Sequence, residues 1–410
     1  MRPICFLLWI LLCNCSSTSS RQETDAEKQQ TDPRAIQVQR QKKETYTSPS
    51  GISASNEFEG ARAEDIRFSN DSIYVTINPE NTPINASAWF ALALWAESNQ
   101  DIHLTLRYTH HKHRYLPKVS NDRSHWQSLS REEVSLSNDS TQATFSISVS
   151  KDTLWVAAQE VISSSATYQW VDSTLHTHEF LEKEIIGKTL WGNDLVLIKH
   201  EQTEVKPSVV FIARQHPPEV PGGVIAFRSF FHRVMDQSSL SRSFREKFNV
   251  YTFPLLNPDG ADAGHWRHNA NGKDLNRDWI GFSQPETQIT RDYLLNKSQE
   301  GKKIVFGIDF HTSYTGPYLL ILDSLNELKL PTKIIPQWTS AIPSDHPAAV
   351  GMQYRRRSQE LSYCYNWFFR EFGAEAVTYE DGDEIARSLV RERGELFAEK
   401  WMEALLNTKF

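Results

Sequence analysis

The chain has 410 residues, of which 39% are hydrophobic and 23% are charged. This composition permits a packed core and excludes a wholly disordered chain, and the length suits two or three domains. The net charge of −7 argues against a protein that binds nucleic acid through a basic face. Three of the four cysteines, Cys5, Cys13 and Cys15, lie at the N-terminus, so Cys364 stands alone in the rest of the chain. An intrachain disulfide framework is therefore excluded.

Residues 1–15 are predicted to be an export signal. Residues 4–12 form an apolar run that is too short to span a bilayer. The sequence LCNC that ends at Cys15 resembles a bacterial lipoprotein signal, in which a Leu three residues ahead of a Cys marks that Cys for lipidation. Cys13 is a second candidate for the lipid, and a secretory signal that is simply cleaved is the alternative. Both interpretations predict an exported protein, in the periplasm or at the cell surface, that contacts the membrane only through a lipid anchor.

Residues 16–57 are predicted to be a flexible tether. Ser, Thr, Gln, Lys and Glu predominate there, and large apolar residues are almost absent. A segment of this composition buries too little apolar surface to fold alone. Behind a lipidated Cys, it would hold the folded part of the chain away from a membrane.

Residues 58–180 have the pattern of an antiparallel β-sandwich domain. Short runs that alternate between apolar and polar residues, or are wholly apolar, are separated by turn sequences rich in Asn, Asp, Ser and Pro. The strands are predicted at 73–77, 89–95, 102–107, 144–149 and 153–157.

Residues 181–410 follow a different pattern, in which short apolar strands alternate with longer helical stretches. This alternation predicts an α/β domain whose sheet is covered by helices on both faces. The strands are predicted at 209–213, 250–254, 304–308 and 376–379, and the helices at 224–235, 285–296, 358–372 and 385–406.

Candidate metal ligands follow two of these strands. His216 and Glu219 come after the strand at 209–213 and are three residues apart, so that an imidazole and a carboxylate can reach one ion. His311 follows the strand at 304–308 and offers a third ligand. Two nitrogens, one carboxylate and an open position for water are a common catalytic zinc arrangement. A His-x-x-Glu pair alone also occurs in solvated loops, but its place at a strand end favours the metal site.

Other polar motifs lie between and after these ligands. Asn276 and Arg277 stand side by side, and a guanidinium fork with an amide donor beside it suits a carboxylate ligand. The alternative for Arg277 is a surface salt bridge. Glu380 comes directly after the strand at 376–379, where it is placed for general-base chemistry, although a loop carboxylate is the alternative.

Taken together, the ordered motifs HPPE, NPDG, WR, DLNRDW, QPE, DFH and TYE resemble those of the zinc carboxypeptidase family. The resemblance extends from about residue 199 to the C-terminus. The β-domain ahead of it resembles the arrangement of the cytosolic-carboxypeptidase-like branch. The resemblance implies a mixed central sheet with helices on both faces, one bound zinc ion, and a peptide substrate with a free C-terminus.

The resemblance also implies roles for individual residues. It assigns zinc ligation to His216, Glu219 and His311, orientation of His216 to Asp274, polarisation of the scissile carbonyl to Arg267, binding of the terminal carboxylate to Asn276 and Arg277, and the general base to Glu380.

A tyrosine often precedes the base in this family, and Tyr354, Tyr363 and Tyr365 are all available here. Tyr365 is the preferred candidate for this substrate-binding role. The segment 355–357 holds three consecutive arginines. They would suit an acidic substrate residue, but charges at the start of the helix predicted at 358–372 are the favoured interpretation.

The predicted function is hydrolysis of the C-terminal bond of a peptide or cell-wall peptide through a zinc-activated water. A zinc-dependent amidase or deacylase, acting on a small acylated amino acid or a peptidoglycan peptide, is the first alternative. The second is a non-catalytic surface protein that retains the shape of the site. The full set of motifs favours the carboxypeptidase, and the sequence does not indicate an oligomeric state.

Overall fold

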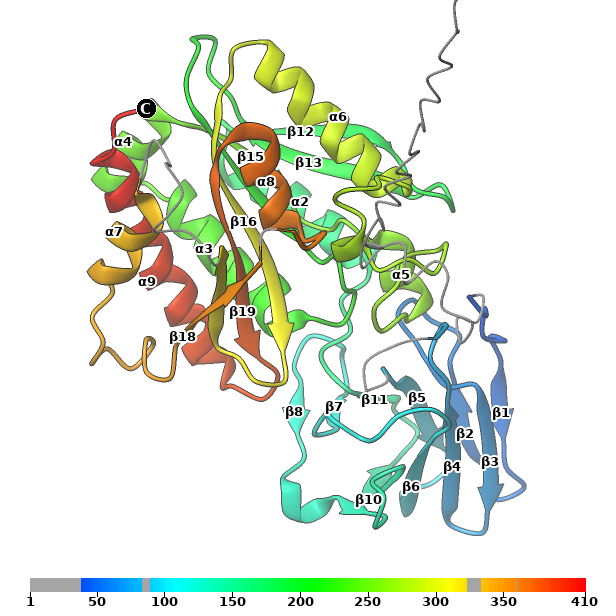
Figure 1. Ribbon diagram of the computed structural model, residues 1–410. Coiled ribbons are helices and arrows are strands. Elements are labelled where there is room, and N and C mark those ends of the chain that lie inside the picture. The colour runs from blue at the N-terminus through cyan, green and yellow to red at the C-terminus, as the bar shows by residue number, and fades with distance from the viewer. Residues whose placement is uncertain (1–37, 83–88, 323–332, 359) are drawn as a thin grey trace, which may run out of the picture.

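The computed structural model describes residues 38–82, 89–322, 333–358 and 360–410, which form a β-rich domain and an α/β domain (Figure 1). The predicted signal at 1–15 lies outside the described residues. No helix in the described ranges is both long enough and apolar enough to cross a membrane.

The β-rich domain is built from two sheets that enclose one apolar core. Strands such as β4 and β10 bury every second residue, which accounts for the alternating sequence pattern. Most neighbours are antiparallel, as predicted, but β4 and β6 run parallel. In spatial order, one sheet is β1 (Thr45–Thr47), β2 (Ile52–Ser55), β5 (Ala91–Ala96), β11 (Leu154–Ala157), β7 (Lys118–Ser120) and β8 (Gln127–Ser128). The other is β3 (Asp65–Ser69), β4 (Ser72–Ile77), β6 (Gln100–Tyr108), β10 (Gln142–Val149) and β9 (Ser135–Leu136).

The tether predicted at 16–57 does not reach residue 57, because β1 and β2 pair as a hairpin at the edge of the first sheet. The side chain of Asn56 fastens this hairpin by donating to the carbonyl oxygens of Lys42 and Ala63, each at 2.8 Å. Ile52 and Ala54 of this hairpin are buried in the core of the domain, and backbone hydrogen bonds between β2 and β5 join the hairpin to the rest of the sheet.

The α/β domain is built on a mixed sheet of eight strands. The four central strands β15, β14, β16 and β19 are parallel, and β13 and β17 join them antiparallel on either side. The mixed sheet implied by the motifs is thus confirmed. In spatial order, the strands are β12 (Glu182–Lys188), β13 (Asp194–His200), β15 (Asn249–Phe253), β14 (Ser208–Ala213), β16 (Ile304–Ser313), β19 (Glu375–Gly382), β17 (Tyr318–Leu322) and β18 (Gln353–Arg357).

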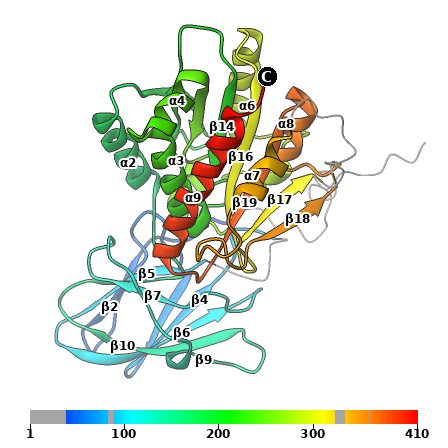
Figure 2. The ribbon, with the colours of Figure 1, turned by 90° about the vertical axis from the view of Figure 1, so that its left-hand side faces the viewer.

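Helices cover both faces of this sheet: α3, α4 and α9 lie on one side, and α6 and α8 on the other (Figure 2). In α3, the buried residues Phe227, Phe230, Phe231 and Val234 recur at helical spacing and so form one apolar face. The helices are α2 (Ser164–Thr177), α3 (Phe227–Met235), α4 (Ser239–Lys247), α5 (Pro258–Ala263), α6 (Pro285–Gln299), α7 (Ile334–Ala341), α8 (Cys364–Phe372) and α9 (Arg387–Leu406). Short helical turns occur at Arg131–Glu133, Pro221–Ala226 and Leu275–Arg277.

The favoured interpretation of the three arginines at 355–357 is wrong. They belong to the edge strand β18, and the helix predicted at 358–372 begins later, at Cys364. The backbone N–H of Cys364 donates to Oδ1 of Asn276 at 2.9 Å, which satisfies one of the free N–H groups at the helix start.

Candidate functional site

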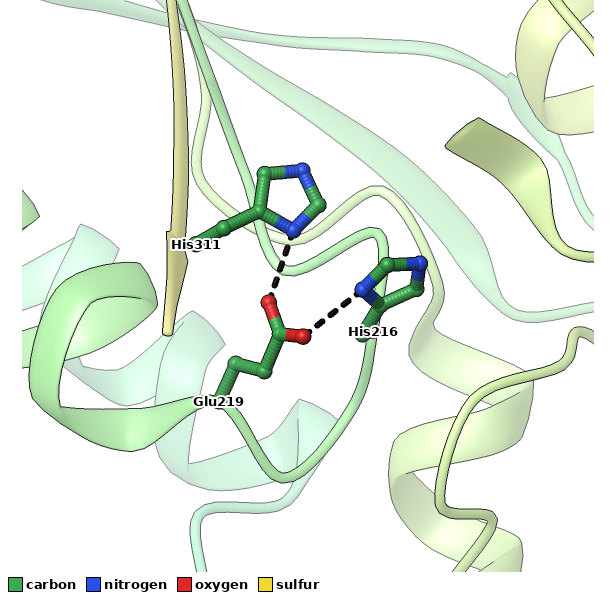
Figure 3. Close-up of side chains that lie close together, drawn as sticks. All are labelled: His216, Glu219 and His311. Carbon is green, nitrogen blue, oxygen red and sulfur yellow. Dashed lines mark hydrogen bonds and ion pairs between the residues drawn. The ribbon is translucent and has the colours of Figure 1, made fainter. Parts of the chain in front are cut away.

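The central parallel strands bring the three predicted metal ligands together (Figure 3). His216 and Glu219 lie on the loop after β14, and His311 lies near the end of the neighbouring strand β16. The Glu219 carboxylate stands between the two rings, with Nδ1 of His216 and Nδ1 of His311 each 2.7 Å from one of its oxygens. The ligand atoms all lie within 4.8 Å of one another. Two imidazole nitrogens and one carboxylate in this arrangement fit a zinc ion.

The outer nitrogen of each ring is held by a buried aspartate. Nε2 of His216 donates to Asp274 at 2.9 Å, and Nε2 of His311 donates to Asp309 at 2.9 Å. A carboxylate on the outer nitrogen fixes the ring orientation and leaves Nδ1 to face the metal, as in many zinc sites. The contact between Asp274 and His216 was predicted, whereas the role of Asp309 was not.

A close backbone contact sets the position of Glu219. The π-helical turn Pro221–Ala226 follows it, and the backbone N–H of Gly222 donates to Oγ1 of Thr312 at 2.7 Å. A Cβ atom at residue 222 would lie 1.6 Å from the carbonyl oxygen of His311, so only glycine allows this approach. The turn therefore packs directly against β16, the strand that carries His311.

Glu380 lies beside the metal ligands because β19 pairs with β16 so that Glu380 is opposite His311. Its Oε2 atom is buried and has no hydrogen-bond partner among the described residues. Burial raises the pKa of Glu380 to about 8, with a further contribution from the negative charge of Glu219. A buried carboxyl group whose pKa lies near neutrality is suited to exchange a proton with groups beside the metal ligands.

Arg267 is connected to the metal ligand His216 through Asp274. Its Nε atom donates to one oxygen of Asp274 at 2.7 Å, while the other oxygen holds His216. Burial opposes the charge of Asp274, but Arg267 and His216 keep its pKa well below the ordinary value. Asp274 is therefore an ionised link between a metal ligand and a cationic side chain.

Asn276 and Arg277 also face this site. The Asn276 oxygen is used by the start of α8, and its amide nitrogen lies 3.3 Å from Nε2 of His311. The guanidinium carbon of Arg277 lies 4.3 Å from the centre of the Tyr363 ring. Tyr365, the preferred tyrosine for substrate binding, does not line the cleft: its side chain is fully buried, and Tyr363 lines the cleft instead. Tyr363 precedes α8 and Tyr365 lies in its first turn, and the two rings stack with their centres 5.8 Å apart, with Tyr365 on the buried side.

The cleft has a volume of about 340 Å³ and contains the three metal ligands, Glu380 and five arginines. Arg267 and Arg277 were predicted to lie here. The others are Arg355 and Arg357 from β18 and, unexpectedly, Arg114 from the β-rich domain. Arg114 is held by an ion pair with Asp383 at 2.7 Å. A larger hollow of about 700 Å³ lies between the domains but includes none of the metal ligands, so chemistry rather than size identifies the site.

Another residue that was not predicted is Glu80 of the β-rich domain, which supports the cleft without lining it. Its carboxylate accepts backbone hydrogen bonds from residues 266–268, the segment that carries Arg267. No local sequence signal identifies it, since one acidic residue in a turn is common. Its partners lie more than 180 residues away in the sequence.

Comparisons with known proteins agree with this geometry. Residues 167–321 match the family described as zinc carboxypeptidase, a range that includes the metal ligands and ends before Glu380. Over 181 residues, the chain is 28% identical to human cytosolic carboxypeptidase 4, which corresponds to 38% of this chain and 16% of that protein. The chain thus spans only about a sixth of this relative.

Two solved bacterial structures share the fold over most of their length. A metallo-carboxypeptidase from Burkholderia cenocepacia has a TM-score of 0.68 at 20% identity and covers 87% of this chain and 98% of its own. A metallo-carboxypeptidase from Pseudomonas aeruginosa, in complex with (2-guanidinoethylmercapto)succinic acid, has a TM-score of 0.67 at 18% identity and covers 86% and 98%. The two solved structures share the fold of this chain, and the match to the zinc carboxypeptidase family includes His216, Glu219 and His311, the three residues whose arrangement fits a zinc ion.

Proposed function

We propose that this protein is a zinc-dependent carboxypeptidase that hydrolyses the last bond of a peptide with a free C-terminus. The observation that carries the proposal is one cleft that combines the three metal ligands, a buried carboxylate at Glu380 and the guanidinium groups of Arg267 and Arg277. One zinc ion, held by His216, Glu219 and His311, would supply an activated water and a Lewis acid.

The residues around the metal ligands suit the proton and charge movements of peptide hydrolysis. The Glu380 carboxylate would take a proton from the attacking water and pass it to the nitrogen of the departing amine. Arg267 would donate hydrogen bonds to the scissile carbonyl oxygen and stabilise the negative charge that develops there. Asp274 supports this role because it holds the Arg267 guanidinium at 2.7 Å.

Arg277 would restrict the reaction to the chain end. Its guanidinium offers two parallel donors to the terminal carboxylate, and the Asn276 amide offers another donor. A peptide without a free C-terminus would leave this cation without its partner, which favours exopeptidase over endopeptidase activity.

The excess of positive charge in the cleft supports a substrate with an acidic residue near its C-terminus. The cleft is lined by five arginines and two glutamates, and the arginines still outnumber the carboxylates when Asp383 and Asp274, which pair with Arg114 and Arg267, are included. Arg355 is held in place by donating to Oγ1 of Thr315 at 2.9 Å and by the ring of Tyr318, 3.7 Å away. A guanidinium fixed in this way is pre-organised for a carboxylate.

Digestion of a peptide library, including cell-wall peptides, tests the proposal. Each peptide is supplied with a free and an amidated C-terminus and with Glu or Lys as the last residue, and the released residue is identified by mass. We expect release of single residues from free C-termini, with Glu preferred over Lys. Equal cleavage of amidated peptides would instead support an endopeptidase or a deacylase, and no cleavage would support a binding protein.

The variant Glu380→Gln separates catalysis from metal binding. We expect it to retain zinc and to lose about 10²–10⁴-fold in kcat, because the proton acceptor is removed while the ligands remain. Zinc content by elemental analysis and kcat on the best library peptide provide the two measurements. Full residual activity with normal zinc content would exclude Glu380 as the base.

We also propose, from the sequence of residues 1–15, that the protein is exported and anchored through Cys15. The variant Cys15→Ser should move the protein from the membrane fraction to the soluble fraction of its host. A wild-type protein found entirely in the soluble fraction would contradict the lipid anchor.

A further inference from the structure

The β-rich domain reaches into the site through Glu80, which lies beyond the end of β4. This side chain is only 1% exposed. Its carboxylate accepts from the backbone N–H groups of Trp266 at 3.0 Å, Arg267 at 2.8 Å and His268 at 2.9 Å. It also contacts the Nδ1 atom of the His268 ring at 2.9 Å. One carboxylate thus holds three consecutive backbone amides.

Burial of a carboxylate is unfavourable unless hydrogen bonds and opposite charges compensate for lost hydration. Burial would raise the pKa of Glu80, but the hydrogen bond with the His268 ring and the positive charge of Arg62 contribute to keeping it well below the ordinary value. Glu80 is therefore ionised, and its hydrogen bonds to the backbone belong to the stronger, charge-assisted kind.

Two other side chains of the β-rich domain hold the same loop. The hydroxyl of Tyr115 accepts from the indole N–H of Trp266 at 2.9 Å, and the amide of Asn81 donates to the carbonyl oxygen of Gly272 at 3.0 Å. On the opposite side, Asp274 fixes the guanidinium of Arg267. The backbone of Arg267 is thus fixed by one domain and its side chain by the other.

We propose that Glu80 is a positioning residue for the reaction. By holding the amides of residues 266–268, it places the Arg267 guanidinium where the oxygen of the scissile carbonyl gains negative charge. The inference rests on the proposed carboxypeptidase function. It adds that the β-rich domain takes part in catalysis by holding the backbone of Arg267, while Asp274 of the α/β domain holds its side chain.

The variant Glu80→Gln in the zinc-loaded full chain tests this role. The side chain keeps its size, but one carboxylate oxygen becomes an NH₂ group, which cannot accept from a backbone N–H. We expect kcat on a peptide substrate to fall by about 10-fold, with KM changed by less than about twofold, because a displaced donor weakens transition-state binding more than substrate binding. Zinc content should not change. An unaltered kcat would overturn the proposal.

A double-mutant cycle with Arg267→Ala shows whether Glu80 acts through Arg267. We expect Glu80→Gln to have little further effect on kcat in the Arg267→Ala background, since the side chain that it positions is gone. If the two losses multiply, Glu80 acts independently of Arg267 and the proposal is wrong.

Glu160→Gln is the matched control. Glu160 is also a carboxylate that joins the two parts of the chain, through an ion pair with Arg387 at 2.8 Å, but it does not contact residues 266–268. We expect it to lower thermal stability without the kcat loss of Glu80→Gln. An equal loss of kcat would mean that domain contacts in general, rather than Glu80, support catalysis, and would overturn the proposal.

Amide hydrogen exchange gives a readout that does not depend on activity. The N–H groups of residues 266–268 should exchange at least about 10-fold faster in Glu80→Gln than in the wild type and in Glu160→Gln. Unchanged exchange would overturn the proposal even if kcat fell. If the wild type hydrolyses no peptide, the proposed function fails, and the exchange rates still decide whether Glu80 holds this loop.

Discussion

The two sides of the cleft are built in different ways. On the metal side, His311 lies within a central strand and His216 and Glu219 follow directly after another, so the backbone of the sheet fixes their spacing. On the opposite side, Arg267 and Arg277 lie on the connection between α5 and α6, which contains no strand. That connection is fixed by side chains instead, among them Asp274 and, from the other domain, Glu80.

The difference shows how a fold can separate two requirements. A metal site needs ligands at fixed distances, and adjacent parallel strands provide them wherever polar residues follow their ends. A substrate site must vary with the substrate, and a loop held by side-chain contacts can be altered without disturbing the sheet. Asp274 is the point where the two sides meet, because its two oxygens hold His216 and Arg267.

The largest effect on activity is expected from the removal of a metal ligand. His311→Ala removes one of three ligands and should leave the protein without stoichiometric zinc. Activity should fall by about 10³-fold or more, since the metal contributes several kcal/mol to transition-state stabilisation. Elemental analysis and kcat measure the two effects. His125→Ala, at a ring that is 90% exposed, is the control and should change neither. Retention of a full equivalent of zinc would contradict the ligand assignment.

An intermediate effect is expected at the point where the two sides meet. Asp274→Asn keeps the shape of the side chain but removes the charge that orients His216 and Arg267. Loss of such an outer carboxylate typically lowers metal affinity by about 10–100-fold. The zinc dissociation constant, measured by competition with a chelator, and kcat at saturating zinc should both be impaired. The exposed Asp292→Asn is the control. A change in zinc affinity with normal kcat would show that Asp274 serves the metal side alone.

The metal side was also the part most accessible from sequence. The strands at 209–213 and 304–308 are continuous apolar runs, and the polar residues that follow them include His216, Glu219 and His311. Their place after buried strands identifies them as candidate ligands from sequence alone. The α/β sheet with helices on both faces and the β-rich domain were likewise indicated by the spacing of apolar residues, whereas the mixed strand directions were implied only by the family resemblance. Local patterns carry this information because each depends on only a few neighbouring residues.

The substrate side was less accessible because it depends on contacts between distant segments. Glu80 and Arg114 come from another domain, and no local pattern distinguishes them from surface charges. The sequence also did not distinguish Tyr363, which lines the cleft just before α8, from Tyr365, which is buried within α8. The start of α8 depends on a hydrogen bond from Cys364 to Asn276, which lie 88 residues apart.

A last prediction concerns stability rather than catalysis on the substrate side, where Glu286 supports residues 264–284, the arginine loop that carries Arg267 and Arg277. Its carboxylate accepts from the Asn269 amide at 3.1 Å, and its other oxygen has no partner among the described residues. Burial raises the pKa of Glu286 to about 7 from the ordinary 4.5. Below pH 4.5 the group is protonated in both states. Between about pH 4.5 and pH 7, Glu286 is ionised in the unfolded chain but protonated in the folded protein. The free energy of unfolding should therefore fall as the pH rises through this range.

Ionisation of Glu286 in the unfolded chain should lower the free energy of unfolding by about 3 kcal/mol over this pH range, at 1.36 kcal/mol for each pKa unit. Glu286→Gln should abolish this decrease. Denaturant unfolding of the wild type and the variant at pH 4.5 and pH 7.5 measures the change, with the exposed Glu300→Gln as the control. The stability difference between Glu286→Gln and the wild type should grow in favour of the variant as pH rises. A difference independent of pH would mean that Glu286 stays ionised in the folded protein. The arginine loop would then be held by a charge at this end too, as it is at Glu80.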